Sequence, residues 1–124
     1  MARSLSRLFE ERKDSDFSLS VVYGLKEIDR RVFRQLAGEG CGMKIDTLAD
    51  SVDRDRSTVY RSVQRLTDAG VVEKKKVNYD SGGYYHLYVP EDPGKAAEDM
   101  REEVERCREQ MEEMIRVFRE KYSD

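Results

Sequence analysis

The sequence has few of the residues from which metal sites and catalytic sites are usually built. It contains one histidine, His86, and two cysteines, Cys41 and Cys107, which lie far apart and form no CxxC pair. A structural zinc site needs about four such ligands, so we expect no metal and no cofactor. No nucleophile–base pair or phosphate-binding loop is visible either, and an enzyme is therefore not expected.

Long hydrophobic runs are also absent. No stretch approaches the ~20 apolar residues that a membrane-spanning helix needs, and the first residues, MARSLSRLFEERKD, lack the apolar core of a secretory signal. Thiols in a chain without such a signal suit a reducing compartment. We therefore expect a cytoplasmic protein that has no membrane partner.

Charged residues, by contrast, are abundant. Of the 124 residues, 40% are charged and 38% are hydrophobic, and the net charge is −3. So small a share of apolar residues makes a single domain marginal by itself and favours an oligomer. Residues 51–90 carry seven basic and five acidic side chains, whereas residues 91–124 carry seven basic and twelve acidic ones. Because local patches govern the attraction to phosphate, the middle of the chain can still bind nucleic acid.

Apolar residues at gaps of three and four predict three helices, over residues 24–38, 44–52 and 56–69. Each would bury one face. Gly38 and Gly40 would end the first helix, because glycine tolerates a positive φ. The residues expected to face the core are Leu25, Ile28, Val32 and Leu36 in the first helix, Ile45, Leu48, Ala49 and Val52 in the second, and Val59, Val63 and Leu66 in the third.

Two strands are predicted after these helices, over residues 71–77 and 84–89. The segment between them, NYDSGG, is rich in turn formers, so the strands would form a β-hairpin. We expect Pro90 and Pro93 to close the domain.

The two ends of the chain are predicted to be amphipathic helices. A short helix over residues 3–12 would place Leu5, Leu8 and Phe9 on one face. Over residues 95–122, apolar side chains recur at alternating gaps of three and four, the a/d pattern of a coiled coil. A helix of about 42 Å is too long for a small domain to cover, so its apolar edge needs a partner, most simply a second copy. The seven positions of this seam are Ala97, Met100, Val104, Cys107, Met111, Met114 and Phe118.

Helix, short helix, turn, helix and hairpin follow one another in the order of a winged helix-turn-helix. The predicted fold class is mainly α (α+β), with a two-stranded β-wing and a long C-terminal dimerisation helix. We expect an N-terminal amphipathic segment over residues 1–16, a DNA-binding domain over 17–92 and the dimerisation helix over 93–124.

In such a fold the third helix enters the major groove, which is about 12 Å wide. Asp55 is expected to cap the start of this helix. Arg56, Arg61 and Gln64 on its outer face are candidates for base edges, because arginine can bond guanine, and glutamine adenine, through two hydrogen bonds. The other candidates on this face are Ser57, Thr58 and Tyr60, whose hydroxyls suit phosphates, and Arg65, which suits either kind of contact.

The hairpin adds basic and polar residues beside this helix. Lys74, Lys76, Asn78 and Tyr79 are candidates for contacts with the flanking backbone or the minor groove. Lysines of this kind also keep an exposed edge strand soluble, so both interpretations stay open. The tyrosines that we expect to be packing residues are Tyr84, Tyr85 and Tyr88.

Two other functions fit parts of the sequence. A winged helix can bind another protein of the transcription machinery, and the acidic tail suits this alternative, although the outer face of the third helix lacks apolar anchors. A thiol-based redox-responsive regulator is the other alternative. Cys107 would face its own copy in a parallel pair, and Cys41 lies in a glycine-rich turn. A simple buried thiol is the favoured interpretation of Cys107.

The stretch DTLADSVDRDRSTVYRSVQRLTDAGVVEKKKV, residues 46–77, resembles the DNA-binding domain of the archaeal TrmB-like regulators, which are close to the MarR group. The segments GGYYH and DPGK before the long helix also resemble small archaeal members, so the likeness covers about residues 20–122. It implies a homodimer joined by terminal helices and a role in regulating transcription. Full-length TrmB proteins carry a separate sugar-binding domain, for which this sequence leaves no room, so sugar sensing is not expected.

These expectations combine into one hypothesis. Two copies pair through residues 95–122 and place their recognition helices in successive major grooves of double-stranded DNA, about 34 Å apart. The binding site would then be an inverted repeat. The sequence assigns no effector, and it leaves both parallel and antiparallel pairing of the long helices open.

Overall fold

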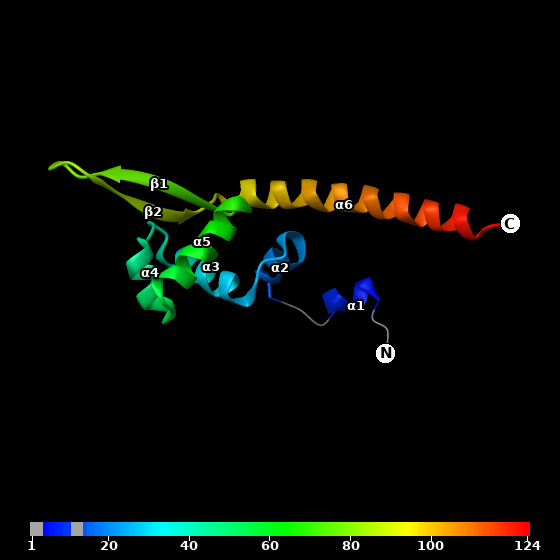
Figure 1. The fold of residues 1–124 in the computed structure, drawn as a ribbon, viewed down its shortest axis with the longest axis horizontal. Coiled ribbons are helices and arrows are strands. Elements are labelled where there is room, and N and C mark those ends of the chain that lie inside the picture. Colours follow the sequence, from blue (N-terminus) through cyan, green and yellow to red (C-terminus); the bar gives the residue numbers. More distant parts are fainter. Residues whose placement is uncertain (1–3, 11–13) are drawn as a thin grey trace. The chain divides into compact units, whose positions relative to one another are not determined.

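The computed structural model describes residues 4–10 and 14–124 and divides into two compact units, one ending at Glu91 and one beginning at Asp92. The fold is the predicted one, mainly helical with a two-stranded wing and a long C-terminal helix (Figure 1). In chain order the elements are α1 (Leu5–Glu10), α2 (Phe17–Tyr23), α3 (Glu27–Glu39), α4 (Ile45–Val52), α5 (Arg56–Asp68), β1 (Val72–Asn78), β2 (Tyr84–Pro90) and α6 (Pro93–Tyr122).

The core of the first unit lies among α3, α4 and α5, with α2 packed on α3. The predicted apolar faces are confirmed for α4 and α5, where every residue expected to be inside is buried. In α3, Val32 and Leu36 are fully buried, whereas Ile28 is half-buried. Helix α5 therefore turns its outer face away from the core.

The predicted first helix of the core was placed too early. Residues 17–23 form a separate helix, α2, which the sequence analysis missed, and Gly24 ends it with a φ of 68°. Helix α3 begins only at Glu27 and continues through Gly38 to Glu39, so Gly40 alone ends it. Leu25 is buried as expected, but it lies in the connection between the two helices. Helix α2 has only seven residues, which is too short for its apolar spacing to indicate a helix.

The N-terminal prediction is confirmed in part. Helix α1 covers Leu5–Glu10, and its apolar residues Leu5, Leu8 and Phe9 are all exposed. Residues 3, 11 and 12 of the predicted helix lie outside the described residues.

The wing is an antiparallel pair of strands, β1 and β2, in which Lys74 lies opposite Tyr88 and Lys76 opposite His86 (Figure 1). Both strands end one residue later than predicted, and β1 also begins one residue later. Pro90 belongs to β2 rather than to the connection. Met43 forms an isolated antiparallel β-bridge with Tyr88 of β2. Its backbone N–H donates to the Tyr88 carbonyl (3.1 Å), and its carbonyl accepts from the Tyr88 N–H (2.9 Å). This bridge joins the wing to the segment that leads into α4.

Helix α6 has 30 residues and starts two residues earlier than predicted. Pro93 occupies its first turn, where the absent N–H costs nothing, and the Asp92 carboxylate accepts from the Lys95 N–H at 3.0 Å. Ion pairs three or four residues apart cover its polar faces, among them Arg108–Glu105 and Arg116–Glu120. No helix in the described parts of the chain has the apolar length that crossing a bilayer would require.

Candidate nucleic-acid interface

The start of helix α5 is held by a side-chain cap, as predicted. One carboxylate oxygen of Asp55 accepts the Thr58 N–H (3.3 Å) and the Ser57 hydroxyl (2.5 Å), and the other accepts the Thr58 hydroxyl (2.5 Å). The Ser57 and Thr58 hydroxyls are the main reasons why the pKa of Asp55 falls to about 2. Both hydroxyls, which the sequence offered as phosphate donors, are therefore engaged in the cap.

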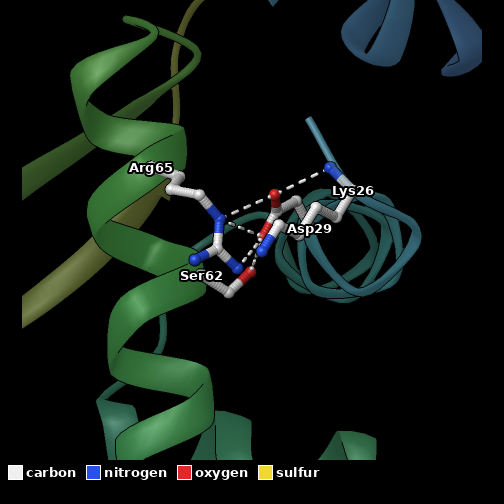
Figure 2. Close-up of polar contacts among 4 residues, drawn as sticks. All are labelled: Lys26, Asp29, Ser62 and Arg65. Atoms are coloured by element: carbon white, nitrogen blue, oxygen red, sulfur yellow. Dashed lines mark hydrogen bonds and ion pairs between the residues drawn. The ribbon is translucent and has the colours of Figure 1, made fainter. Parts of the chain in front are cut away.

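The second half of α5 is fixed to α3 by a buried carboxylate, Asp29, which is 0% exposed. The Arg65 guanidinium binds it through Nε (2.9 Å) and Nη2 (2.8 Å), and the Ser62 hydroxyl donates to it at 2.6 Å (Figure 2). The backbone N–H of Lys26 supplies a further hydrogen bond (2.9 Å). The carboxylate is thus satisfied from two helices, and the angle between α3 and α5 is fixed where they meet.

This network gives Arg65 a structural position. The sequence offered Arg65 as a DNA contact, but two of its nitrogens are bound to Asp29, and its side chain is only 34% exposed. Burial raises the pKa of the Asp29 carboxyl, but the hydrogen bonds from Arg65, Ser62 and Lys26, with the charge of Arg65, outweigh it and leave that pKa below its ordinary value. The sequence analysis missed Asp29. An acidic residue near the start of a helix is common, because it interacts favourably with the helix dipole, and so it does not by itself indicate a buried ion pair.

The outer face of α5 carries the remaining predicted residues. Tyr60, Arg61 and Gln64 are exposed there, and Arg56 is exposed at the start of the helix. The Nε of Arg56 lies 2.7 Å from a carboxylate oxygen of Asp46 in α4, and both side chains of this pair are largely in solvent. Such a pair contributes little to stability, so the guanidinium can exchange Asp46 for another anion.

Asp53 forms the turn between α4 and α5. It has a φ of 55°, and its backbone N–H donates to Ala49 and Asp50 as the C-cap of α4. Aspartate is one of the few residues other than glycine that adopts this left-handed conformation at a modest cost.

The wing brings lysines and tyrosines together. Lys76 lies over the ring of Tyr84 (4.3 Å to the centroid), and Lys74 is exposed on the same face of β1. Asn78 and Tyr79 are exposed at the tip, as predicted. The packing role predicted for the tyrosines holds for Tyr88, which is 4% exposed, and in part for the half-buried Tyr85. It is wrong for Tyr84, which is 55% exposed.

One residue of this region was not identified from the sequence. Lys44, just before α4, lies 4.1 Å from the ring centroid of Tyr85, and its ammonium donates to the Tyr79 hydroxyl at 3.3 Å. The two rings also contact each other, with their centroids 4.8 Å apart. This Lys44–Tyr79–Tyr85 clasp joins the wing tip to α4. No sequence signal could have found it, because Lys44 is more than thirty positions away from both tyrosines.

The predicted dimerisation residues lie along α6, where no residue is buried. Val104 is 54% exposed, Met114 70% and Phe118 65%, and Met111 is exposed as well. Ala97 and Met100, nearer the start of the helix, are half-buried. Both cysteines are free and exposed, and the Cys107 thiol lies 3.7 Å from the sulfur of Met111. Within the described residues, no group of three histidine, cysteine or acidic side chains is arranged to hold a metal ion.

This arrangement of a capped outer helix beside a basic wing agrees with the comparison with known families. The family of the sugar-specific transcriptional regulator TrmB matches residues 19–94, which is more than half of the chain and includes most of α2 and every element from α3 to β2. The chain belongs to the TrmB family. This is a family of transcriptional regulators, and its winged-helix fold is the one that the sequence resemblance implied.

Individual proteins and solved structures are also similar to this chain. An uncharacterized protein of Methanocaldococcus jannaschii, MJ1503, is 42% identical over 73 residues, which are 59% of this chain and 54% of that protein. This chain thus spans about half the length of that relative. A solved structure, a possible transcriptional regulator from Methanosarcina mazei, has the same fold with a TM-score of 0.72 at 21% identity, over 82% of this chain and 86% of its own. A MarR protein from Peptoclostridium difficile has a TM-score of 0.50 at 22% identity, over 97% of this chain and 71% of its own.

Proposed function

We propose that this TrmB-family chain is a homodimeric, sequence-specific double-stranded DNA-binding regulator that acts on an inverted repeat. The observation that carries the proposal is the orientation of α5. Its valines and Leu66 are buried, and Arg61 and Gln64 on the opposite side are free of partners in the described part of the chain. A helix that offers an arginine and a glutamine to the outside suits the edges of guanine and adenine.

The proposed contacts are fewer than the sequence suggested. Arg61 and Gln64 read base edges, and Asn78 and Lys76 in the wing reach the flanking backbone or minor groove. Ser57, Thr58 and Arg65 hold α5 in place instead, because their polar groups are used by Asp55 and Asp29. A rigid helix is an advantage here, since base readout requires side chains at fixed positions.

The exposed seam of α6 supports the homodimer. Its large apolar side chains, from Val104 to Phe118, are left in water in a single copy. Arginine–glutamate pairs occupy the other faces of the helix and keep them soluble. The apolar edge is therefore the part of α6 that is left for a second copy to cover. Two α6 helices would bury this edge against each other, in either parallel or antiparallel orientation.

The experiment is to recover genomic DNA that the protein binds, sequence it, and measure affinity for the enriched duplex by fluorescence anisotropy. We expect an inverted repeat. Arg61→Ala should weaken binding by ~1–3 kcal/mol per half-site and relax the preference at one base pair. Arg101→Ala, which removes an equally exposed arginine from α6, is the matched control and should leave the preference unchanged.

The proposal fails if no sequence is enriched and if duplexes of every sequence stay unbound at low salt. The alternative of a protein-interaction module would then gain weight. The outer face of α5 argues against that alternative, because Tyr60 is its only exposed large hydrophobic side chain between Arg56 and Asp68, and protein interfaces centre on buried apolar anchors.

A further inference from the structure

A hollow of about 570 Å³ lies between the start of α5 and the wing. Its lining is aromatic and basic and comes from α4, α5 and both strands. Five tyrosines and one arginine line it, among them Arg56 and Tyr60 from α5, and Tyr88 from β2. Lys74 reaches it from β1 on the strand face that Tyr88 shares.

Tyr88 contributes a hydrogen-bond donor to the hollow. Its side chain is 4% exposed, yet its hydroxyl has no hydrogen-bond partner among residues 4–10 and 14–124. Burial raises the pKa of Tyr88, and Tyr60 and Arg56 are the charged or titratable groups near enough to influence it. Tyr88 therefore stays protonated at neutral pH, and its O–H is a donor at the floor of the hollow. The hydroxyl itself is not a buried atom, so it opens onto the hollow and can donate to an oxygen of a ligand there.

The charges around the hollow favour an anion. Lys74 has no partner in the described part of the chain, and Arg56 uses only its Nε on Asp46. Lys44 also lines the hollow, and Asp46 is the one carboxylate in its lining. Three cationic side chains against one carboxylate leave the space with a net positive charge. Charge-assisted hydrogen bonds from such side chains suit the oxygens of a phosphate.

We propose that this hollow is the seat of one backbone phosphate of the bound duplex, held by Lys74 and Arg56 and by the hydroxyls of Tyr60 and Tyr88. The proposal rests on the proposed function and deepens it. The recognition helix occupies a major groove and the wing tip approaches the neighbouring minor groove. The strand that separates these two grooves has to pass between helix and wing, where the hollow lies. Arg56 then binds backbone and not a base edge.

The test uses the full-length protein and a random-sequence duplex of about 30 base pairs, because a backbone contact does not depend on base sequence. Lys74→Ala should lower the affinity, and the slope of log affinity against log salt should become shallower by about 1 per subunit. Its matched control is Lys75→Ala, the neighbouring lysine on the opposite face of β1, which should change the slope by much less.

Tyr88→Phe tests the Tyr88 hydroxyl without changing charge. We expect an affinity loss of about threefold to tenfold on every duplex, the size of one lost hydrogen bond, with an unchanged salt slope. Tyr122→Phe, which removes a phenol from α6, is the control. Thermal unfolding of both variants shows whether the fold is intact, and Tyr88→Phe should not be less stable, because its hydroxyl has no partner within the described chain.

The outcomes separate the two proposals. If the wild type binds DNA and Lys74→Ala and Tyr88→Phe behave like their controls, the phosphate seat is overturned and the DNA-binding function stands. A duplex with a single neutral methylphosphonate should weaken the wild type at one position per half-site but add nothing to Lys74→Ala. If no duplex binds while inorganic phosphate or pyrophosphate binds in a manner that depends on Lys74, the backbone assignment and the DNA-binding function are both overturned. The hollow then holds a free phosphorylated ligand.

Discussion

A single carboxylate, Asp29, holds helix α5 at its angle to α3. It is 0% exposed, and Arg65, Ser62 and the Lys26 N–H all donate to it (Figure 2). Removing one member of a buried ion pair leaves the other charge without its partner, which costs about 3–5 kcal/mol when both are fully buried. Here the cost is smaller, because the Arg65 side chain is 34% exposed and water can reach it.

We therefore expect Asp29→Asn to lower the free energy of unfolding by about 2 to 3 kcal/mol, measured by urea denaturation. The matched control is Asp46→Asn, which breaks the solvent-exposed pair with Arg56 and should change stability by less than about 0.5 kcal/mol. Equal effects of the two substitutions would contradict a structural role for the buried network.

The same network predicts a pH dependence. The pKa of Asp29 is lowered in the folded protein, so the unfolded chain takes up the proton first as the pH falls. The stability from Asp29 is complete above the ordinary aspartate pKa of about 3.9 and is lost as the pH falls below it. The difference between wild type and Asp29→Asn should therefore be constant near neutral pH and shrink below about pH 4 in the denaturation series.

At the scale of one element, helix α5 depends on its first turn. Asp55 caps it and also engages the Ser57 and Thr58 hydroxyls. Asp55→Ala should cost about 1 kcal/mol in thermal or urea unfolding, whereas Asp55→Ser, which can still accept the Thr58 N–H, should cost a few tenths. A serine variant as unstable as the alanine variant would argue that the two hydroxyl contacts, and not the cap itself, stabilise the turn.

The wing is a second element whose position depends on a few contacts. The Lys44–Tyr79–Tyr85 clasp holds its tip to the start of α4. Lys44→Gln removes the cation–π contact, which is worth about 0.5–1 kcal/mol at an exposed site. We expect faster amide hydrogen exchange in β1 and β2 near the tip with little change in global stability. Lys75→Gln on the same hairpin is the control, and equal exchange in both variants would rule out the clasp as the anchor.

At the scale of the whole molecule, the proposed pairing through α6 would decide how the protein meets DNA. Met111→Lys places a charge in the seam and should shift the protein from dimer to monomer at micromolar concentration, measured by sedimentation. Glu112→Lys, the same side chain one position along and outside the seam, should remain dimeric. A wild type that sediments as a monomer would overturn the homodimer.

Loss of pairing should also weaken DNA binding more than any single contact. A monomer reaches one half-site, so it forgoes the effective concentration that links the second half-site to the first. We expect Met111→Lys to retain its fold by circular dichroism while its affinity for the inverted repeat falls well below that of Glu112→Lys.

The sequence by itself determined the order of elements, the inward faces of α4 and α5, the Asp55 cap and the apolar stripe of α6, because each depends on side chains within one or two helical turns of each other. It failed at α2, whose seven residues carry too few apolar repeats to be recognised as a helix. Only the tertiary structure decided the partners of Asp29 and Lys44 and the hollow around Tyr88. These features join residues distant in sequence, and their free energy comes from burial and charge in a shared environment that no short stretch of sequence contains.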